Sequence, residues 1–320
     1  MSASLPKVIY IAGTPRCGST LLDRLLSLGD DVVSVGELNR IWKTGMIGNA
    51  VCSCGERFHD CEFWSEVIRK AFGTLPRSEV LHLHRAWKKV VRFKNIRQLR
   101  RSREQTPPPG PLSDLAAATA RLYAAIQAVS GCKLIVETSK NCVCPFFLSG
   151  IEQIELSVIH LIRDSRGIAY SWQKKDKIHH WEDGQPVYME SQTLAKSSRD
   201  WIRDQVTALL INGRETPLFR LRYEDLAADP QGTLLLISEF LERLWNHRLN
   251  TRLETTLEQD RETVANFATD HIFSGNPVRF EVGKVRISPD TEWRRSMNWK
   301  DRFVTTTLTL PLLLRFGYRL

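Results

Sequence analysis

A short glycine loop near the N-terminus constrains the fold most strongly. Residues 7–12 (KVIYIA) form an apolar, β-branched run typical of a buried parallel strand. The loop GTPRCGST, from Gly13 to Thr20, follows, and residues 20–28 then place leucines at helical spacing. A strand, a glycine loop and a helix in this order open a nucleotide-binding βα unit. The alternative is a tight turn that binds nothing.

The same alternation continues along the chain. Residues 133–136, 155–162 and 218–223 are predicted as buried strands, and residues 166–174 and 231–244 as helices. Strands that alternate with helices indicate a parallel sheet covered on both faces. We therefore predict the α/β class, with a P-loop-type parallel sheet flanked by helices and one helical insertion.

Residues 73–113 differ from this pattern. They carry a run of lysines and arginines between Arg85 and Arg103, and they end in the cluster Pro107, Pro108, Pro109, Gly110, Pro111. Because strands of one sheet lie on both sides, the prolines mark a break rather than a domain boundary. We predict a basic helical insertion or lid, whose charge forms either a solvated helix face or a binding patch.

Composition narrows the class of protein. The 320 residues carry a net charge of +9, which favours anionic partners without choosing among them. No stretch of about 18 uncharged apolar residues predicts a transmembrane helix. The first predicted strand begins at Lys7, which leaves no room for a signal peptide. We therefore expect a cytoplasmic protein.

The loop itself suggests which phosphate is bound. Gly13 and Gly18 have the spacing of a Walker A loop, but Ser19 stands where the Walker lysine should be. That lysine reaches the β- and γ-phosphates of ATP, so its absence argues against an ATPase or kinase. Arg16, inside the loop, supplies a fixed positive charge instead. A nucleotide without a β,γ-phosphate chain fits this loop best.

The segment TPRCGSTLL resembles the 5′-phosphosulfate-binding motif of the sulfotransferase family. The resemblance implies one sulfotransferase domain over residues 1–320, which uses 3′-phosphoadenosine 5′-phosphosulfate (PAPS) as donor and releases 3′,5′-bisphosphoadenosine (PAP). It implies donor contacts from Thr14, Pro15, Arg16, Cys17, Gly18, Ser19 and Thr20.

Further segments extend the resemblance. Arg163 ends the predicted strand 155–162 and Ser171 follows eight residues later, as in the family motif that holds the 3′-phosphate, although Ser165 and Gly167 replace its usual proline and acidic residue. The segment LRYEDL is similar to a family segment whose tyrosine, here Tyr223, lies near the nucleotide; a core tyrosine is the alternative. The segment GNPVR resembles one seen in bacterial members, which implies that Arg279 lies near the 3′-phosphate or the adenine.

Resemblance also suggests the catalytic groups. Protein-tyrosine sulfotransferases carry a similar Gly-Glu pair after the phosphate loop, which implies that Glu37 is the general base; pairing with an arginine such as Arg40 is the alternative. A lysine in a comparable loop of those enzymes implies that Lys140, with Arg16, stabilises the leaving group; a surface lysine is the alternative. No metal is expected to be required. The expected acceptor is a hydroxyl of a small molecule, carbohydrate or peptide, either anionic or neutral, and nucleic acid is not an expected partner.

A cysteine-rich stretch is compatible with three interpretations: a zinc site, buried thiols or a disulfide. Cys52, Cys54, His59 and Cys61 contain zinc-ligand chemistry, but the C-x-C spacing is tighter than usual for a zinc site. Buried thiols or a disulfide are the favoured alternatives.

Two other functional classes remain open at this level. A P-loop phosphotransferase is disfavoured by the missing Walker lysine and by the lack of an obvious Walker B strand. A non-catalytic nucleotide- or nucleic-acid-binding protein would use the basic run from Arg85 to Arg103.

Overall fold

Five strands, paired in parallel throughout, form the central sheet of the computed structural model, which describes residues 4–105, 108–174, 178–182, 185–188, 191–250, 254–255 and 263–319. The strand order is β2-β3-β1-β4-β7. The strands are β1 (Lys7–Gly13), β2 (Val32–Gly36), β3 (Leu134–Lys140), β4 (Glu155–Ile162) and β7 (Leu218–Arg222). With β1 at the centre, the loop that follows it lies between the ends of β3 and β4.

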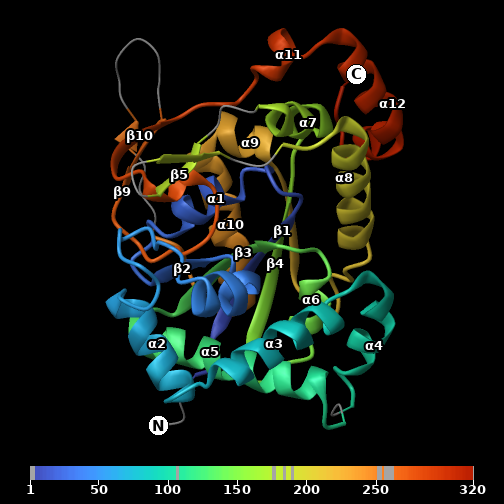
Figure 1. Ribbon diagram of the computed structural model, residues 1–320. Coiled ribbons are helices and arrows are strands. Elements are labelled where there is room, and N and C mark those ends of the chain that lie inside the picture. Colours follow the sequence, from blue (N-terminus) through green and yellow to red (C-terminus); the bar gives the residue numbers. More distant parts are fainter. Residues whose placement is uncertain are drawn as a thin grey trace.

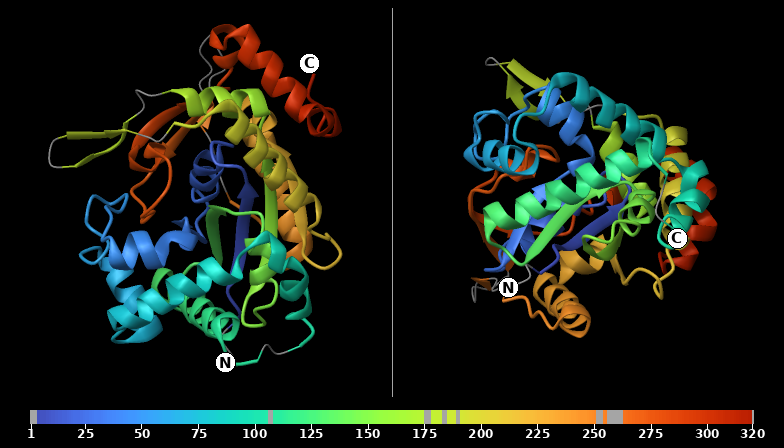
Figure 2. Two further views of the ribbon diagram at one scale, coloured as in Figure 1. Left: turned by 45° about the vertical axis from the view of Figure 1, so that its right-hand side comes forward. Right: turned by 90° about the horizontal axis from the view of Figure 1, so that it is seen from below.

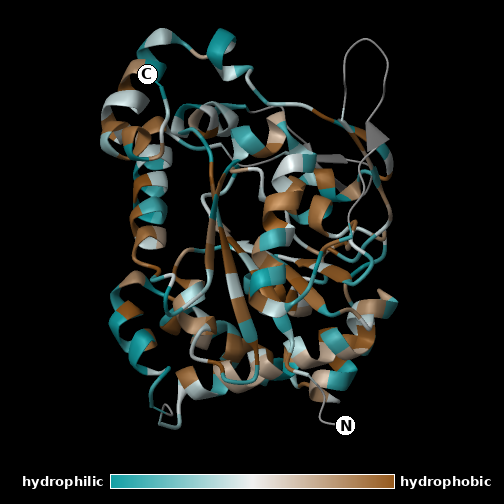
Figure 3. Ribbon diagram, turned by 180° about the vertical axis from the view of Figure 1, so that it is seen from behind, coloured by the Kyte–Doolittle hydropathy of each residue, from teal (hydrophilic) through white to brown (hydrophobic). Residues whose placement is uncertain are grey.

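Each face of the sheet is buried in its own hydrophobic cluster. Val8, Tyr10 and Ala12 of β1 belong to one cluster, and Ile9 and Ile11 belong to the other. This period of two is the alternation of side chains along a strand. Long hydrophobic stretches are visible along the central strands (Figure 3). Burial on both faces is why these strands appear in the sequence as continuous apolar runs.

Helices cover both faces, and α5 and α10 lie on opposite sides of the sheet (Figure 2, right). The first cluster takes in η2 (Ile41–Ile47), α2 (Glu62–Phe72), α3 (Arg77–Val90), α4 (Ile96–Arg101), α5 (Pro111–Ser130) and α6 (Cys144–Leu148). The second takes in α1 (Ser19–Leu26), α10 (Pro230–Trp245) and α12 (Trp299–Arg315). The remaining helices are η1 (Leu38–Arg40), η3 (Phe93–Asn95), α7 (Ser165–Gln173), α8 (Leu194–Leu209), α9 (Tyr223–Ala228), η4 (Pro277–Phe280) and α11 (Trp293–Ser296).

These elements confirm the predicted fold class. The strand predicted at residues 155–162 has the same bounds in the structure, whereas β3 runs four residues beyond its predicted end at Val136. Two antiparallel units were not predicted. They are the pair β5 (Ile178–Glu182) and β6 (Gln185–Tyr188), and the sheet of β8 (Glu254–Thr255), β9 (Thr263–Phe267) and β10 (Gly283–Ile287).

The basic segment at residues 73–113 is helical over most of its described length. Its apolar residues, Val80 and Leu83 among them, belong to the same core cluster as β1, while Pro107 lies outside the described residues. Figure 1 shows α3, α4 and α5 at the end of the molecule where the N-terminus lies, with α7 and α9 at the other end. The segment is thus a layer of the fold, and its role as a lid stays a prediction, as does the single-domain boundary.

Arg24 ties the first helix to the C-terminal part of the chain. Its side chain is almost completely buried, and its guanidinium donates to the carbonyl oxygens of Ala268, Val278, Arg279 and Glu281 at 2.5–3.1 Å. The guanidinium also lies 4.3 Å from the centre of the Phe267 ring. Five donors in a fixed planar fork suit this arrangement, which a lysine could not reproduce.

We expect Arg24→Met to lower the free energy of unfolding by about 3 kcal/mol, because it leaves several buried carbonyls without a donor. Urea unfolding of the variant against the wild type measures this loss. Arg243→Met, at an exposed position of α10, is the matched control and should change stability by less than about 0.5 kcal/mol. Equal stability of the two variants would contradict the anchoring role.

Candidate active site

The glycine loop passes directly from β1 into α1. Gly18 has φ 93°, in the left-handed region that glycine adopts without strain. A Cβ at this position would lie within 3 Å of the Tyr223 ring, so the ring packs against the loop. The first-turn amides of α1 have no carbonyl partner within the helix, and the helix N-terminus carries a partial positive charge. The loop therefore offers an anion site.

A chain of buried polar groups supports the loop from behind. Gln205 of α8 donates through Nε2 to Thr14 Oγ1 at 3.2 Å, and its Oε1 lies 2.9 Å from His160 Nε2. Burial lowers the pKa of His160 to about 4, so the imidazole is neutral at physiological pH. Thr14, Cys17, Ser19 and Thr20 are buried within the loop, whereas Pro15 is exposed.

Arg163 leaves the end of β4 and reaches the loop. Its Nη1 donates to the Arg16 carbonyl oxygen at 3.0 Å, and its guanidinium lies 4.5 Å from the centre of the Tyr223 ring. Trp201 of α8 donates through Nε1 to the Arg163 carbonyl oxygen at 3.0 Å. The structure thus brings together the phosphate loop and Arg163, which the sequence analysis assigned to the 5′ and 3′ phosphates of the donor. Helix α8 supports both.

Arg16 and Arg163 form a cationic pair. Arg16 lies over the Trp172 ring, 4.6 Å from its centre. Burial, together with the neighbouring charge of Arg163, lowers the pKa of Arg16 below its ordinary value. A bound anion would relieve this repulsion because it favours the charged form of both guanidinium groups.

Asp290 is the acidic partner of Arg163. Its Oδ2 accepts from Arg163 Nη2 at 2.9 Å, and its backbone N–H donates to the Tyr223 hydroxyl at 3.2 Å. Burial raises the pKa of Asp290, but the charge of Arg163 outweighs it and leaves the pKa below its usual value. An anion that binds Arg163 must therefore displace or share this carboxylate.

Helix α7 explains a departure from the family motif. A Cβ at Gly167 would lie 3.1 Å from two atoms of the Trp293 ring and 3.3 Å from Arg163 Nε. The acidic residue usual at this position would therefore crowd the Arg163 side chain. Ser171 is buried farther along the same helix.

Glu37 and Lys140 form a nearly buried ion pair. Lys140 Nζ donates to Glu37 Oε1 at 2.5 Å and to the Thr138 carbonyl oxygen at 2.9 Å, and Arg40 Nε lies 2.7 Å from Glu37 Oε2. Burial raises the pKa of Glu37, but the two cations outweigh it and hold the pKa below its ordinary value. Glu37 is therefore ionised at neutral pH. It pairs both with Lys140, the predicted catalytic lysine, and with Arg40, the partner in the alternative interpretation.

A buried network beneath this pair fixes its position. Tyr123 and Ser139 both donate hydroxyl hydrogen bonds to the Glu137 carboxyl group. Ser139 Oγ in turn accepts from the backbone N–H of Asn39 at 3.0 Å, which joins β3 to η1, the short helix that follows Glu37. Lys140, the last residue of β3, has φ 62°, an uncommon conformation for a residue other than glycine.

Arg279 lies on the Glu37 side of the site. It is buried, its Nη1 donates to the Gly275 carbonyl oxygen at 2.8 Å, and its Nε has no hydrogen-bond partner among the residues that the structure describes. Burial lowers the pKa of Arg279 to about 10, against the opposing charge of Glu37. A Cβ at Gly275 would lie 3.7 Å from Thr20 Oγ1, so this segment runs beside the phosphate loop.

A sequence model of the sulfotransferase domain matches residues 6–274. The chain belongs to the sulfotransferase family. The matched span of this sulfotransferase includes the loop, Glu37, Lys140, Arg163 and Tyr223, and it ends before Arg279. No curated protein matches the sequence closely enough to count as a relative.

One solved structure supports the fold of this sulfotransferase, and two more are similar to the chain at lower TM-scores. The chain is similar to the sulfotransferase domain of the olefin synthase from Synechococcus PCC 7002, with 18% identity, a TM-score of 0.53, and coverage of 100% of this chain and 98% of that one. The sulfotransferase domain from the curacin biosynthetic pathway gives 16% identity, a TM-score of 0.48, and coverage of 99% and 100%. A sulfotransferase from Mycobacterium avium gives 12% identity, a TM-score of 0.46, and coverage of 99% and 79%.

Among the described residues, none of the helices combines the length and the apolar character that a membrane span requires.

Several residues of the sulfotransferase site were not found from the sequence. Asp290, Gln205 and Trp201 contact predicted site residues that lie 38 to 191 positions away along the chain. None stands in a recognisable motif, so no local signal could have found them. Glu137 was visible only as an acidic residue just after a predicted buried strand.

Glu137 makes the stability of the protein depend on pH. Burial raises its pKa from the ordinary 4.5 to about 7, although the Ser139 and Tyr123 hydrogen bonds oppose this shift. The folded state therefore binds a proton that the unfolded state has released, so stability falls as pH rises through this window. The loss is at most about 3 kcal/mol.

We expect the wild type to lose stability relative to Glu137→Gln between about pH 5 and about pH 8. Urea unfolding at several pH values measures the difference. Glu242→Gln, at an exposed position of α10, is the control and should follow the wild type. A constant difference between Glu137→Gln and the wild type across this range would show that Glu137 does not titrate there.

Proposed function

We propose that the protein transfers the sulfuryl group of PAPS to an acceptor hydroxyl and releases PAP. The observation that carries the proposal is the contact between the two anion-binding elements. Arg163 donates to the backbone of Arg16 at 3.0 Å, which brings the Arg163 guanidinium to the loop that precedes α1, and its charge acts on the Arg16 guanidinium. Two phosphates of one nucleotide match two adjacent cationic anchors better than the phosphate chain of ATP does.

In this proposal the loop holds the 5′-phosphosulfate and Arg163 with Ser171 holds the 3′-phosphate. The amides of the loop and the first turn of α1 supply hydrogen bonds, and Arg16 supplies charge. Tyr223 packs on Gly18 and under Arg163, so its ring keeps the two anchors at a fixed spacing. Arg279, buried with an unpartnered Nε beside the loop, contributes a further positive charge to the donor site.

The chemical step is an in-line displacement at sulfur. The acceptor oxygen forms a bond to sulfur, and the bond between sulfur and the bridging 5′-phosphate oxygen breaks with its electron pair on that oxygen. Glu37, ionised by its cationic neighbours, takes the acceptor proton. An ammonium has three donors, and Lys140 uses two on Glu37 and Thr138, so the third can stabilise the leaving oxygen together with Arg16. The reaction needs no metal, because the donor carries fewer charges at its reacting centre than ATP does.

We expect Arg163→Ala to weaken PAP binding by roughly 10- to 100-fold while changing 5′-AMP binding little, because only PAP carries the 3′-phosphate. Asp290→Asn should have the opposite effect and strengthen PAP binding, because it removes the carboxylate that competes for Arg163. Calorimetric titration measures both, with Asp60→Asn at an exposed position as the control. Unchanged selectivity for PAP over 5′-AMP in Arg163→Ala would refute the assignment.

The activity itself is tested with labelled PAPS and a panel of sugars, phenols, lipids and peptides, anionic ones included. We expect transfer to at least one hydroxyl acceptor, and a loss of roughly 10²- to 10⁴-fold in kcat/KM for Glu37→Gln. Glu62→Gln, at the exposed start of α2, is the control. Tight Mg²⁺-dependent ATP binding with no binding of PAP would instead support a phosphotransferase.

The pH dependence of kcat/KM tests the role of Glu37, and the Lys140→Ala variant tests the role of Lys140. Because the pKa of Glu37 lies below its ordinary value, kcat/KM should stay flat from about pH 5.5 to about pH 7.5, whereas a histidine base would cause a fall near pH 6.5. Lys140→Ala should lower kcat more than it weakens donor binding. The reverse pattern would move Lys140 from catalysis to recognition.

A further inference from the structure

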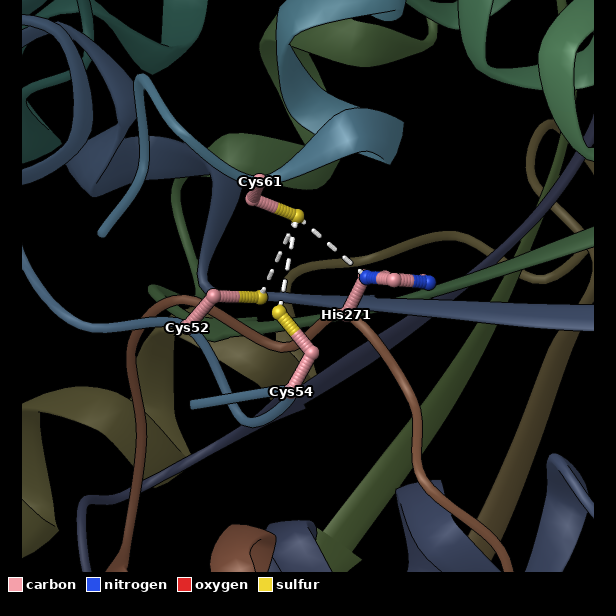
Figure 4. A group of neighbouring side chains, drawn as sticks. All are labelled: Cys52, Cys54, Cys61 and His271. Atoms are coloured by element: carbon pink, nitrogen blue, oxygen red, sulfur yellow. Dashed lines mark hydrogen bonds between the residues drawn. The ribbon is translucent and has the colours of Figure 1, made fainter. Parts of the chain in front are cut away.

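Three cysteines and one histidine meet beside the candidate active site. The donor atoms of Cys52, Cys54, Cys61 and His271 all lie within 4.8 Å of one another. Figure 4 shows the three sulfur atoms and the imidazole turned toward a common centre, with His271 on a segment more than 200 residues from the cysteines in sequence. The proposed sulfuryl transfer does not use this cluster.

The four side chains of the cluster come from separate elements of the structure. The segment around Cys52 and Cys54 is a small hairpin, in which Val51 pairs with Arg57 and the Cys52 N–H donates to the Glu56 carbonyl oxygen at 2.8 Å. Gly55, at φ 95°, makes the tight turn after Cys54. Cys61 stands at the N-cap position of α2.

The three distances from Cys61 to the other ligand atoms match the edges of a tetrahedral metal site. Cys61 Sγ lies 3.7 Å from Cys54 Sγ, 3.8 Å from Cys52 Sγ and 3.3 Å from His271 Nδ1. Zinc binds sulfur at about 2.3 Å and nitrogen at about 2.0 Å, so the edges of a tetrahedral site are about 3.8 Å between sulfurs and about 3.5 Å between sulfur and nitrogen. A disulfide would need two sulfurs at about 2.0 Å, would join only two of the cysteines, and would leave the histidine unexplained.

We propose that Cys52, Cys54, Cys61 and His271 bind one Zn²⁺ in a closed, four-ligand structural site. Thiolate and imidazole are the ligands that zinc prefers, and four protein ligands leave no open position for a substrate or a water nucleophile. The site therefore adds a metal where the sequence predicted none to be required, and it gives that metal a structural rather than a catalytic task.

The histidine differs from the one that the sequence suggested. His59 lies three residues before the start of α2 in the same cysteine-rich stretch. It is exposed, and its Nε2 lies 3.0 Å from the Met46 carbonyl oxygen. The grouping of His59 with the cysteines is therefore wrong. His271 takes that place because the chain after β9 folds back against the hairpin, which no local spacing could reveal.

A ring contact and several hydrogen bonds around the cluster hold His271 in position. Its ring stacks on Phe63, with ring centres 4.9 Å apart and planes 13° apart, and Trp64 Nε1 donates to its carbonyl oxygen at 2.7 Å. Ser53 Oγ accepts from the Ile272 N–H at 2.8 Å and donates to the Asp270 carbonyl oxygen at 2.7 Å. Such outer contacts orient metal ligands in known sites.

The proposed zinc would fix one wall of the candidate active site. The segment that contains His271 continues to Ile272 and Ser274, and a Cβ at Gly36 would lie within 3 Å of both. Gly36 is the neighbour of Glu37, and Gly275 lies beside Thr20 of the phosphate loop. A metal that joins the hairpin to this segment would stabilise the arrangement of Glu37, the loop and Arg279.

The test is metal analysis of the full chain, purified without a metal-binding tag in a reducing buffer. We expect about one zinc per chain, and Co²⁺ added to the metal-free protein should give the strong visible absorption of a tetrahedral thiolate site. Removal of the zinc with a chelator should lower Tm, and added Zn²⁺ should restore it. Less than about a tenth of an equivalent of zinc, with no Co²⁺ spectrum, would overturn the proposal.

Matched variants identify the ligands. His271→Ala should weaken zinc binding by more than about 100-fold in competition with a chromophoric chelator, whereas His59→Ala should leave it unchanged. Cys54→Ser and Cys132→Ser form a second pair with the same expected contrast. His271→Cys should retain zinc as a four-cysteine site, which keeps the test decisive if His271→Ala fails to fold.

Two outcomes would replace the proposal with another. A non-reduced mass lower by two hydrogens, mapped to two of the three cysteines and unaccompanied by metal, would establish a disulfide. Iron in place of zinc at full occupancy would establish a different metal. None of these measurements depends on sulfuryl transfer, so failure of the zinc site and failure of the proposed activity are distinguishable.

Discussion

The buried guanidinium of Arg24 is the interaction on which the site most depends. It lies on α1, the helix whose N-terminus forms the phosphate loop, and it holds the backbone of residues 268–281 through four carbonyl oxygens. A buried charge is costly unless it is compensated, and here the four carbonyl oxygens and Asp270, 3.5 Å from Arg24 Nε, compensate it. The helix that follows the phosphate loop thus also anchors the segment that contains Arg279. Loss of the Arg24 hydrogen bonds would disturb both the loop and Arg279.

The charges of the site are balanced within the chain. Asp290 satisfies Arg163, and Glu37 satisfies both Lys140 and Arg40. Asp290 and Glu37 thus lower the energy of the buried cations Arg163 and Lys140, but each also competes with an anionic ligand for the same cation. Donor binding at Arg163 would therefore be an exchange of a carboxylate for a phosphate rather than the filling of a vacant positive site. Such an exchange favours ligands that carry more than one negative charge.

Sequence patterns predicted the parts of the fold that are locally encoded. The apolar runs predicted β1, β3, β4 and β7 but not β2, and short contiguous motifs located the phosphate loop and Arg163, whose anion binding stays a proposal. The end of β3 was placed too early because Glu137, Thr138 and Ser139 are polar, yet hydrogen bonding from Tyr123 and Ser139 allows Glu137 to be buried. Arg24 was visible only as a polar interruption in a leucine-rich helix. His271 and Asp290 act through tertiary contacts, which a single sequence does not reveal.

The backbone at Arg16 and Lys140 has a consequence for how this site can change. Four described residues other than glycine have positive φ, and two of them, Asn49 and Asn246, are asparagines, which tolerate that conformation. The other two are Arg16 and Lys140, where the left-handed backbone costs roughly 1–2 kcal/mol. Glycine at either position would relax the chain and remove the cation. Selection for thermostability alone would therefore favour replacing these two charges, so their retention across homologues would be a sign of selection on function.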